Sequence, residues 1–514
     1  MFLSSKTKNK QIAKNSVFLY IRMFISMAIT LYTSRVVLQA LGIDDYGIYN
    51  VVGGIVTMFS AVYASLSVSI SRFITFALGE GDAVKLAKTF VTAVNVQILL
   101  SIVALILAES VGMWFMHSYM NIPLGKMELA EWVLHFSVAT TIVNLISIPY
   151  NALIVAHEKM AAFAYISIIE VTMKLLIAYI VIFSSYNHLF IYALLLFILA
   201  LIIRIIYGSY CRKKFLEARY TFAFYFDVFK DMSSFAGWNF FGNLSNIASG
   251  QGTNMLINVF FGVSFNAARG IANQVESAVN QFVNSFSMAF MPQITKSYAS
   301  GELGYMCSLI RVSTKYSRIL ILFPIVPLIV ETEFILSMWL NVVPDQTVIF
   351  VKIILTTSFV TVVSSTLVSS IFATGKIKCY QLILSIIHFL IFPVVWLFFY
   401  IGFPAWTCFI VAMFFYLIAN IWRLSELKRL VAFPFLPYLI DAFLKPVIVF
   451  AIALFVCFGI NQMVQISILR LFINTISSSI VILAASYVIV LGNKEKQFIL
   501  KQVSFIIDRI KTVK

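Results

Sequence analysis

The chain has 514 residues, of which 61% are hydrophobic and only 11% are charged. Soluble domains are about half apolar and about a quarter charged, so this composition excludes a water-soluble globular protein and predicts a polytopic membrane protein. In a soluble protein the net charge of +16 would suggest nucleic acid binding. Here the basic residues lie at the ends of apolar runs, so we interpret them as topology signals and expect no nucleic acid partner.

Apolar runs of spanning length follow one another along the chain. A helix needs about 20 mostly apolar residues to cross a bilayer, and about fourteen runs meet that length. The sequence therefore predicts an all-α membrane protein with about fourteen transmembrane helices. The runs lie near residues 16–39, 50–76, 88–108, 129–149, 160–183, 188–208, 233–260, 267–291, 315–338, 347–372, 379–400, 404–422, 438–459 and 467–491.

The connections between these runs alternate in charge. The second carries Arg72, Lys85 and Lys88, whereas the first carries Asp44 and Asp45. The same alternation continues along the chain, with Lys and Arg concentrated in the even-numbered connections. By the positive-inside rule it predicts an even number of spans and both termini in the cytoplasm. No cysteine falls in an expected outer loop and no C-x-x-C occurs, so we expect neither disulfides nor metal sites.

A short motif indicates an internal repeat. Gly47–Asn50 reads GIYN and residues 270–273 read GIAN, and each is followed by a Gly-Glu turn, 33 residues later for Glu80 and 32 for Glu302. The match predicts two six-helix bundles of the same orientation, at 1–210 and 233–425, which would place a substrate site between them. The alternative is a coincidence between two glycine-rich turns.

Three further segments complete the expected organisation. Residues 211–232 mix basic and aromatic side chains and are interpreted as a cytoplasmic interfacial connector. Residues 437–491 form two additional transmembrane helices beyond the repeat. Residues 492–514 alternate Lys and Arg with apolar residues, which is typical of a basic amphipathic helix on the inner leaflet, with membrane lipids as its partner.

Polar side chains form stripes on the seventh and eighth runs. Residues three and four apart share one helix face, so both stripes must face protein or a water-filled cavity rather than lipid. We favour a cavity, and the alternative is interhelical hydrogen bonding by Asn. The eighth run carries Arg269, Asn273, Glu276, Asn280, Asn284 and Ser287, and the seventh carries Asn239, Asn243, Asn246 and Asn254.

The first and fifth runs contribute further ionisable groups. Arg22 lies well inside the first run and Arg35 near its outer end, and for both the alternative to a cavity position is snorkelling. Glu170 and Lys174 are one helical turn apart near mid-membrane. They form either a structural ion pair or a titratable site whose partner changes during transport. Each such group costs roughly 2.5–3.5 kcal/mol at the bilayer centre and so needs a function or a partner.

These groups together predict a cationic substrate site. Arginine can bind phosphate oxygens bidentately, so the cavity suits an anionic substrate. Glu276 and Glu170 are the carboxylates expected to couple transport to H⁺ or Na⁺, because burial favours protonation of a carboxylate. No other cofactor is expected. The residues assigned to the cavity wall are Arg22, Arg35, Lys174, Asn239, Asn243, Arg269, Asn273 and Asn280.

Two stretches near the start of the chain resemble the start of bacterial polysaccharide-biosynthesis flippases. They are NSVFLYIRMFISMAITLYTSRVVLQALGIDDYGIYNVVGGIVTMFSA and, after it, SRFITFALGEGD. These belong to the multidrug/oligosaccharidyl-lipid/polysaccharide exporter superfamily. The likeness is strongest over residues 15–90 and continues more weakly as GIANQVESAV. It implies a V-shaped, MATE-like pair of bundles in the bacterial inner membrane that works by alternating access.

The resemblance also implies a cargo and partners. The cargo would be an undecaprenyl-diphosphate-linked oligosaccharide, such as an O-antigen, capsule or exopolysaccharide unit, moved from the inner to the outer leaflet. Arg22, Arg35 and Arg269 match in kind the positions that related flippases use for the diphosphate. Polysaccharide polymerase and ligase machinery would be further partners.

Two other functions stay open. An ion-coupled multidrug antiporter of the same superfamily would need a more acidic and aromatic cavity and often carries an acid in the first run, which this chain lacks there. An integral-membrane polysaccharide polymerase or ligase would need a large polar outer loop. The histidines are scattered, and neither a P-loop nor a G-x-S-x-G motif occurs, so we expect no ATPase and no enzyme.

Overall fold

The computed structural model describes residues 2–57, 60–119, 122, 124–340, 343–493 and 495–497. Over these residues the chain is helical and has no strand. Eleven helices in this part are long and apolar enough to cross a membrane. The remaining predicted runs coincide with α2, α8 and α9, so every predicted run has a helix and the fold class is confirmed. The tail residues 498–514 lie outside the described residues.

The elements are, in chain order, α1 (Phe2–Thr57), α2 (Ser60–Glu80), α3 (Ala83–Leu107), η1 (Ala108–Gly112), α4 (Met113–Tyr119), η2 (Leu124–Lys126), α5 (Met127–Ala156), α6 (Met160–Ile182), α7 (His188–Lys214), η3 (Leu216–Ala218), α8 (Phe226–Phe261), α9 (Val263–Ala299), α10 (Leu303–Val330), α11 (Thr332–Trp339), α12 (Thr347–Thr361), α13 (Ser364–Thr374), α14 (Lys378–Tyr400), α15 (Thr407–Val431), α16 (Phe435–Tyr438), η4 (Leu439–Leu444), α17 (Lys445–Met463), α18 (Ile468–Ala485) and η5 (Ser486–Val490).

Glycines with positive φ separate successive spans. α1 is broken at Gly42, which has φ 74° and ψ 173°, so the first and second predicted spans meet at this residue. Gly262 separates α8 from α9 with φ 87°. A residue without Cβ adopts this left-handed conformation at little cost, which is why both turns use glycine.

Helix boundaries repeat with a nearly constant offset. α3 and α10 start at residues 83 and 303, and α5 and α12 at 127 and 347, an offset of 220 in both cases. The starts of α6 and α14 differ by 218, and those of α7 and α15 by 219. The turn glycines at 42 and 262 also differ by 220, as do Gly81 and Gly301, both with φ 74°. The motif match predicts offsets of 223 and 222. The offset seen in the structure therefore differs from the motif offsets by two or three residues. GIYN and GIAN lie at different distances after their turn glycines, Gly42 and Gly262.

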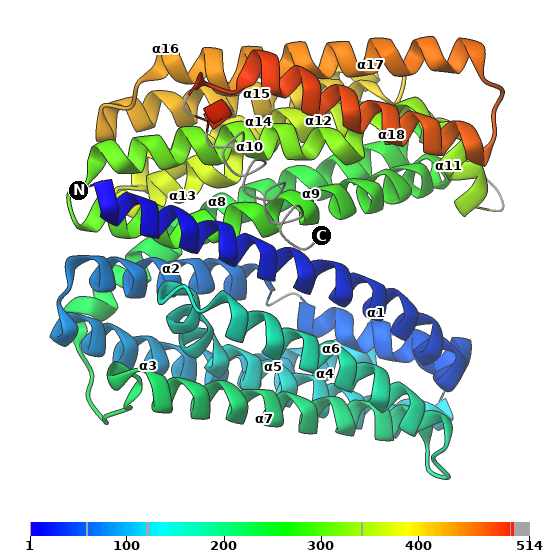
Figure 1. Ribbon diagram of the computed structural model, residues 1–514. Helices are drawn as coiled ribbons and strands as arrows, with labels where there is room; N and C mark the ends of the chain where they lie inside the picture. Colours follow the sequence, from blue (N-terminus) through cyan, green and yellow to red (C-terminus); the bar gives the residue numbers. More distant parts are fainter. Residues whose placement is uncertain are drawn as a thin grey trace, which may run out of the picture. The chain divides into compact units, whose positions relative to one another are not determined.

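The chain divides into two compact units. Unit 1 contains residues 1–247 together with Met288–Met306 and Ser369–Ser385. In this unit α5 packs against α2, α3 and α7, and α1 runs beside α6 (Figure 1). The ring of Phe90 meets that of Tyr150 edge-on at 5.2 Å in its core. The expected connector, 211–232, holds the end of α7, η3, an extended stretch and the start of α8. Tyr220 ties the extended stretch to Asn95 of α3 by a 2.7 Å hydrogen bond.

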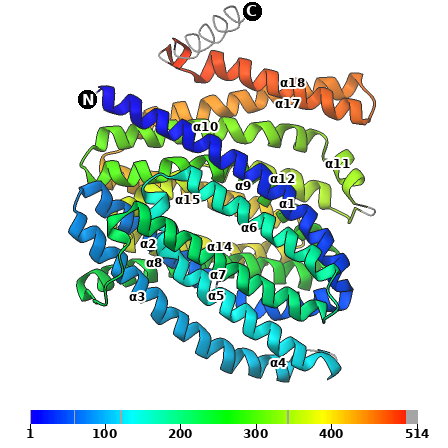
Figure 2. The ribbon, with the colours of Figure 1, turned by 60° about the horizontal axis from the view of Figure 1, so that its bottom comes forward.

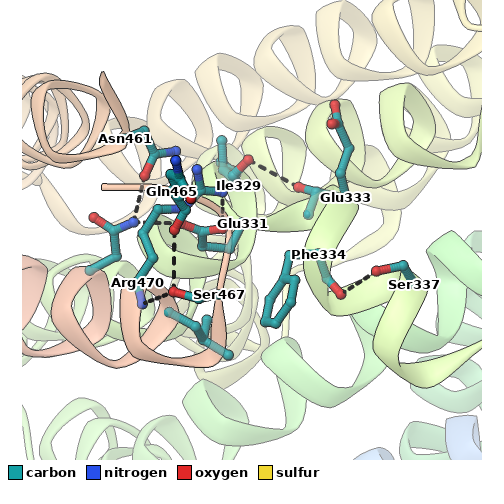
Figure 3. A network of polar contacts seen from close by, with 12 residues as sticks. Ile329, Glu331, Glu333, Phe334, Ser337, Asn461, Gln465, Ser467 and Arg470 are labelled. Carbon is teal, nitrogen blue, oxygen red and sulfur yellow. Dashed lines mark hydrogen bonds and ion pairs between the residues drawn. The ribbon is translucent and has the colours of Figure 1, made fainter. Parts of the chain in front are cut away.

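Unit 2 contains residues 248–287, 307–368 and 386–514. Its last two spanning helices, α17 and α18, lie side by side as a hairpin (Figure 2). Glu331, between α10 and α11, accepts hydrogen bonds from Arg470 at 2.7 Å and from Asn474 at 2.6 Å. Figure 3 shows Arg470 of α18 directed at this carboxylate, so a buried ion pair holds the C-terminal hairpin to α10.

Candidate functional site

Arg22 of α1 lies among side chains of unit 1. Its guanidinium carbon is 4.8 Å from the ring centroid of Phe163 on α6. It interacts electrostatically with Tyr207 of α7 and Glu170 of α6. Its Nε atom is buried and has no hydrogen-bond partner among the described residues. The structure thus places Arg22 against protein groups, with one N–H donor unused.

Glu170 and Lys174 form an ion pair of 2.6 Å on α6, with side chains 36% and 44% exposed. Tyr63 of α2 and Tyr207 also interact with the Glu170 carboxylate. Glu170 is therefore the point where charges and phenols from four helices of unit 1 converge. We call Arg22, Tyr63, Glu170, Lys174 and Tyr207 the unit-1 cluster.

Arg35 is not part of this cluster. It lies thirteen residues after Arg22 on α1 and is exposed. At about 1.5 Å of rise per residue, the two arginines are about 20 Å apart along the helix. The structure does not bring them together.

Arg269 of α9 anchors a second cluster, in unit 2. Its Nη2 donates to the carbonyl oxygen of Gly250 at 3.2 Å, while its Nη1 is buried without a hydrogen-bond partner among the described residues. The guanidinium carbon lies 5.9 Å from the ring centroid of Phe409. Glu276 and Tyr416 lie within electrostatic range.

Glu276 connects α9 to its neighbours. Its carboxylate lies close to the side chains of Asn280 on the same helix and of Ser358 on α12, whose hydroxyl donates to the carbonyl oxygen of Ile354 at 3.1 Å. Arg269, Glu276 and Asn280 therefore share one face of α9, as their spacing predicts. Asn273 lies between them in sequence and is exposed.

Sequence reasoning missed the part of this cluster that lies on α14 and α15. Tyr416 interacts with both Arg269 and Glu276. Arg423 is 7% exposed and donates from Nη1 to Asn420 Oδ1 at 3.0 Å. The His388 ring lies 6.0 Å from that of Tyr416. The signal is present in the sequence, since residues 416, 420 and 423 are four and three apart, but Arg423 lies at the end of an apolar run, where a basic residue is expected as a topology signal. We call Arg269, Glu276, Asn280, Ser358, His388, Tyr416, Asn420 and Arg423 the unit-2 cluster.

Asn239 and Asn243 of α8 bond to other helices of unit 1. Asn239 is 3% exposed, donates to the carbonyl oxygen of Ser65 at 3.3 Å and accepts from Gln381 at 3.2 Å. Asn243 donates to the hydroxyl of Ser65 at 2.9 Å. These contacts correspond to interhelical packing by asparagine.

No family model matches the chain, and no curated protein matches its sequence. Solved structures do match its fold. A MATE protein in the bent conformation aligns with a TM-score of 0.71 and 14% identity, covering 83% of this chain and 96% of its own. The chain has the MATE fold.

Two further solved transporter structures agree. The outward-facing conformation of a multidrug resistance MATE transporter of the MOP superfamily aligns with a TM-score of 0.68 and 14% identity, covering 82% of this chain and 96% of its own. A MOP superfamily transporter from Pyrococcus furiosus, described by a binding pocket of reverse polarity that suggests a different function, aligns with a TM-score of 0.69 and 13% identity at the same coverage. The expected MATE-like arrangement is thus confirmed as a fold.

Proposed function

We propose that this protein is a flippase that moves a polyprenyl-diphosphate-linked oligosaccharide from the inner to the outer leaflet of the bacterial plasma membrane by alternating access. The observation that carries the proposal is the pair of arginines, Arg22 and Arg269, one in each unit. Each lies inside a long helix and each keeps one buried guanidinium nitrogen without a hydrogen-bond partner among the described residues.

Buried unsatisfied donors point to an absent acceptor. An unpaired buried polar group costs about 1–3 kcal/mol, and more when it is charged. Phosphate oxygens accept charge-assisted hydrogen bonds from guanidinium groups, which offset that cost. A diphosphate headgroup supplies several such oxygens, so it suits either arginine better than a neutral or cationic cargo does.

Glu276 is the proposed coupling residue. Its carboxylate, the Asn280 amide and the Ser358 hydroxyl together present the oxygen donors that hard cations prefer. Protonation of Glu276 would serve equally as the coupling step, because it would remove the negative charge that faces Arg269 and Tyr416. Glu170 could couple in the same way in unit 1, with Lys174 as its exchanging partner.

An ion-coupled multidrug antiporter is the second candidate. It is favoured by the aromatic rings next to the arginines, Phe163 and Phe409, and by the MATE fold. Against it, the two clusters hold the cations Arg22, Lys174, Arg269 and Arg423 against two carboxylates, Glu170 and Glu276. An organic cation would be repelled by that excess of positive charge.

The proposal includes a setting in the cell. Both termini would lie in the cytoplasm of a bacterial inner membrane, and polysaccharide polymerase and ligase machinery would use the delivered units. The experiment is complementation of a flippase-deficient strain, with surface polysaccharide as the readout. Arg22→Ala with Arg269→Ala should abolish export at normal protein levels, and Arg22→Lys with Arg269→Lys should restore it only in part, because lysine lacks the bidentate fork.

The matched control for this experiment is Arg212→Ala, which removes an exposed arginine at the end of α7. It should leave export unchanged. Normal export by the Arg22→Ala, Arg269→Ala double variant would refute the proposed role of both arginines.

A further inference from the structure

Unit 1 contains more than the first repeat. Two short segments of the second repeat, Met288–Met306 and Ser369–Ser385, belong to it as well. They are the end of α9 and the turn between α13 and α14. With the repeat offset of 218–220, they correspond to the end of α2 and the turn between α5 and α6, which also lie in unit 1. Four equivalent pieces are therefore gathered at one place.

The ends of α2 and α9 touch at equivalent residues. A Cβ added to Gly79 would lie 2.8 Å from the Cβ of Ala299 and 2.8 Å from the Cα of Lys296. Residues 79 and 299 differ by 220, which is the repeat offset. A residue that touches its own equivalent lies on the pseudo-two-fold axis of the repeat. The backbones meet there because glycine provides no side chain to separate them.

The first polar contact at this place is made by Glu158, in the turn between α5 and α6. Its Oε1 accepts from Lys296 Nζ at 2.6 Å and from Gln293 Nε2 at 2.7 Å, both on α9. Glu158 is 6% exposed and has φ 57°. A non-glycine residue in this conformation is strained and persists only where its surroundings hold it. The ion pair with α9 is such a restraint, and its loss would release the turn.

The second contact is made by Arg72 of α2 with the end of α13. Its Nε donates to the carbonyl oxygen of Phe372 and its Nη2 to that of Ala373, both at 3.2 Å. The last carbonyls of a helix have no partner within the helix and carry partial negative charge, so an arginine is well suited to bind them. Gly375, with φ 75°, leaves room for the guanidinium, since a Cβ there would lie 2.6 Å from Nη2.

The two contacts are related by the repeat. In the first contact, α9 binds the turn that follows α5. In the second contact, α2 binds the end of α13. The repeat makes α2 equivalent to the end of α9, and the end of α5 equivalent to the end of α13. We propose that they form a latch, made of Arg72, Glu158, Gln293, Lys296 and the Gly79–Ala299 contact, which closes this end of the transporter and opens once in each cycle. The latch rests on the proposed function in so far as a transporter must open.

The composition of the latch suits repeated opening. Its polar contacts between segments are one ion pair, one amide hydrogen bond and two hydrogen bonds to helix-end carbonyls, which water can replace when the helices separate. The Arg72 guanidinium also lies over the rings of Phe73 and Phe76 on its own helix. The charge pattern assigns it to the cytoplasmic side, because Arg72 belongs to the basic second connection.

The test measures opening without any cargo. The natural cysteines Cys211, Cys307, Cys379, Cys408 and Cys457 are replaced, and Ser297→Cys is the reporter. Ser297 follows Lys296 on α9 and is 1% exposed, so its labelling rate reports when this end of α9 becomes accessible. A membrane-impermeant maleimide is applied to inside-out vesicles, and the rate of labelling is measured.

We expect Glu158→Gln to raise the labelling rate about tenfold, the change that corresponds to 1.4 kcal/mol of lost contact. Glu158→Lys combined with Lys296→Glu should return the rate towards that of the parent. The control is Asp441→Asn, which breaks the 2.8 Å ion pair with Arg311 away from the latch and should change nothing. Equal rates in the Glu158→Gln protein and its parent would overturn the latch.

A cross-link tests whether opening is required. Glu158→Cys with Gln293→Cys, whose natural side chains are joined by a 2.7 Å hydrogen bond, should be bridged by a short, reducible bifunctional thiol reagent. The cross-link should stop polysaccharide export and reduction should restore it, whereas full export by the cross-linked protein would refute a latch that opens. If the labelling results hold but the parent exports no polysaccharide, the latch stands and the proposed cargo fails.

Discussion

Replacing Arg470 by Met should destabilise the C-terminal hairpin strongly. Arg470 is 8% exposed and Glu331 only 1%, and their side chains are joined at 2.7 Å. Without the guanidinium, the buried carboxylate keeps, among the residues that the structure describes, only the 2.6 Å side-chain hydrogen bond from Asn474. Removing one partner of a buried ion pair costs about 3–5 kcal/mol, because the other charge stays buried.

The expected shift in melting temperature follows from chain size. The entropy of unfolding is about 2.1 cal/mol/K per residue, which gives roughly 1.1 kcal/mol/K if the whole chain melts as one unit. A loss of 3–5 kcal/mol then lowers the melting temperature by roughly 3–5 °C. If a smaller part of the chain melts cooperatively, its entropy of unfolding is smaller and the melting temperature falls further. The measurement is thermal denaturation of the purified protein in detergent, followed by size-exclusion chromatography.

A double variant separates pairing from packing. Arg470→Met with Glu331→Gln removes both charges and leaves no buried ion, so it should recover most of the lost stability. If Arg470→Met melts at the same temperature as the parent, or if the double variant is the less stable of the two, the buried pair does not hold the hairpin to α10.

Three further predictions concern other parts of the molecule. Asn239→Ala should lower stability by about 0.6–2 kcal/mol in detergent melts yet leave export per folded molecule normal, because the Asn239 amide is engaged by Ser65 and Gln381. Burial holds the pKa of His157 below its ordinary value of 6.5, although the carboxylate of Glu217 opposes this shift. The unfolded chain therefore binds more protons, so the stability that His157 contributes is complete above about pH 6.5 and is lost as the pH falls below it. His157→Gln should flatten that part of the stability curve, and an unchanged slope would contradict the assignment. Glu276→Gln should abolish the dependence of transport on the H⁺ or Na⁺ gradient, measured in reconstituted vesicles, and a retained dependence would exclude this carboxylate as the coupling site.

The sequence predicted the helices well because apolar length is a direct physical requirement of a bilayer. It also placed Arg269, Glu276 and Asn280 on one face of a helix, since that arrangement depends only on helical spacing. The spacing could not show which other helices these side chains contact. Asn239 has the same stripe pattern as Asn280, yet it bonds to Ser65 and Gln381 as a packing residue.

Other features depended on contacts between distant segments. Arg423 looked like a topology residue because it lies at the end of an apolar run, and only the fold shows it buried against Asn420. Glu158 follows His157 in an ordinary polar turn, and nothing local predicts its positive φ or its bond to Lys296, 138 residues away. The repeat was found from its motifs, but its register came from the turn glycines at 42 and 262.

The most direct test of the central claim is a flipping assay with purified protein in liposomes. The probe is a fluorescent polyprenyl-diphosphate oligosaccharide in the inner leaflet, and its arrival in the outer leaflet is followed by quenching. The account predicts rapid translocation by the natural protein and none above empty liposomes by the Arg22→Ala, Arg269→Ala variant. Equal translocation by both proteins, or exchange of an organic cation for protons without any movement of the lipid, would contradict it.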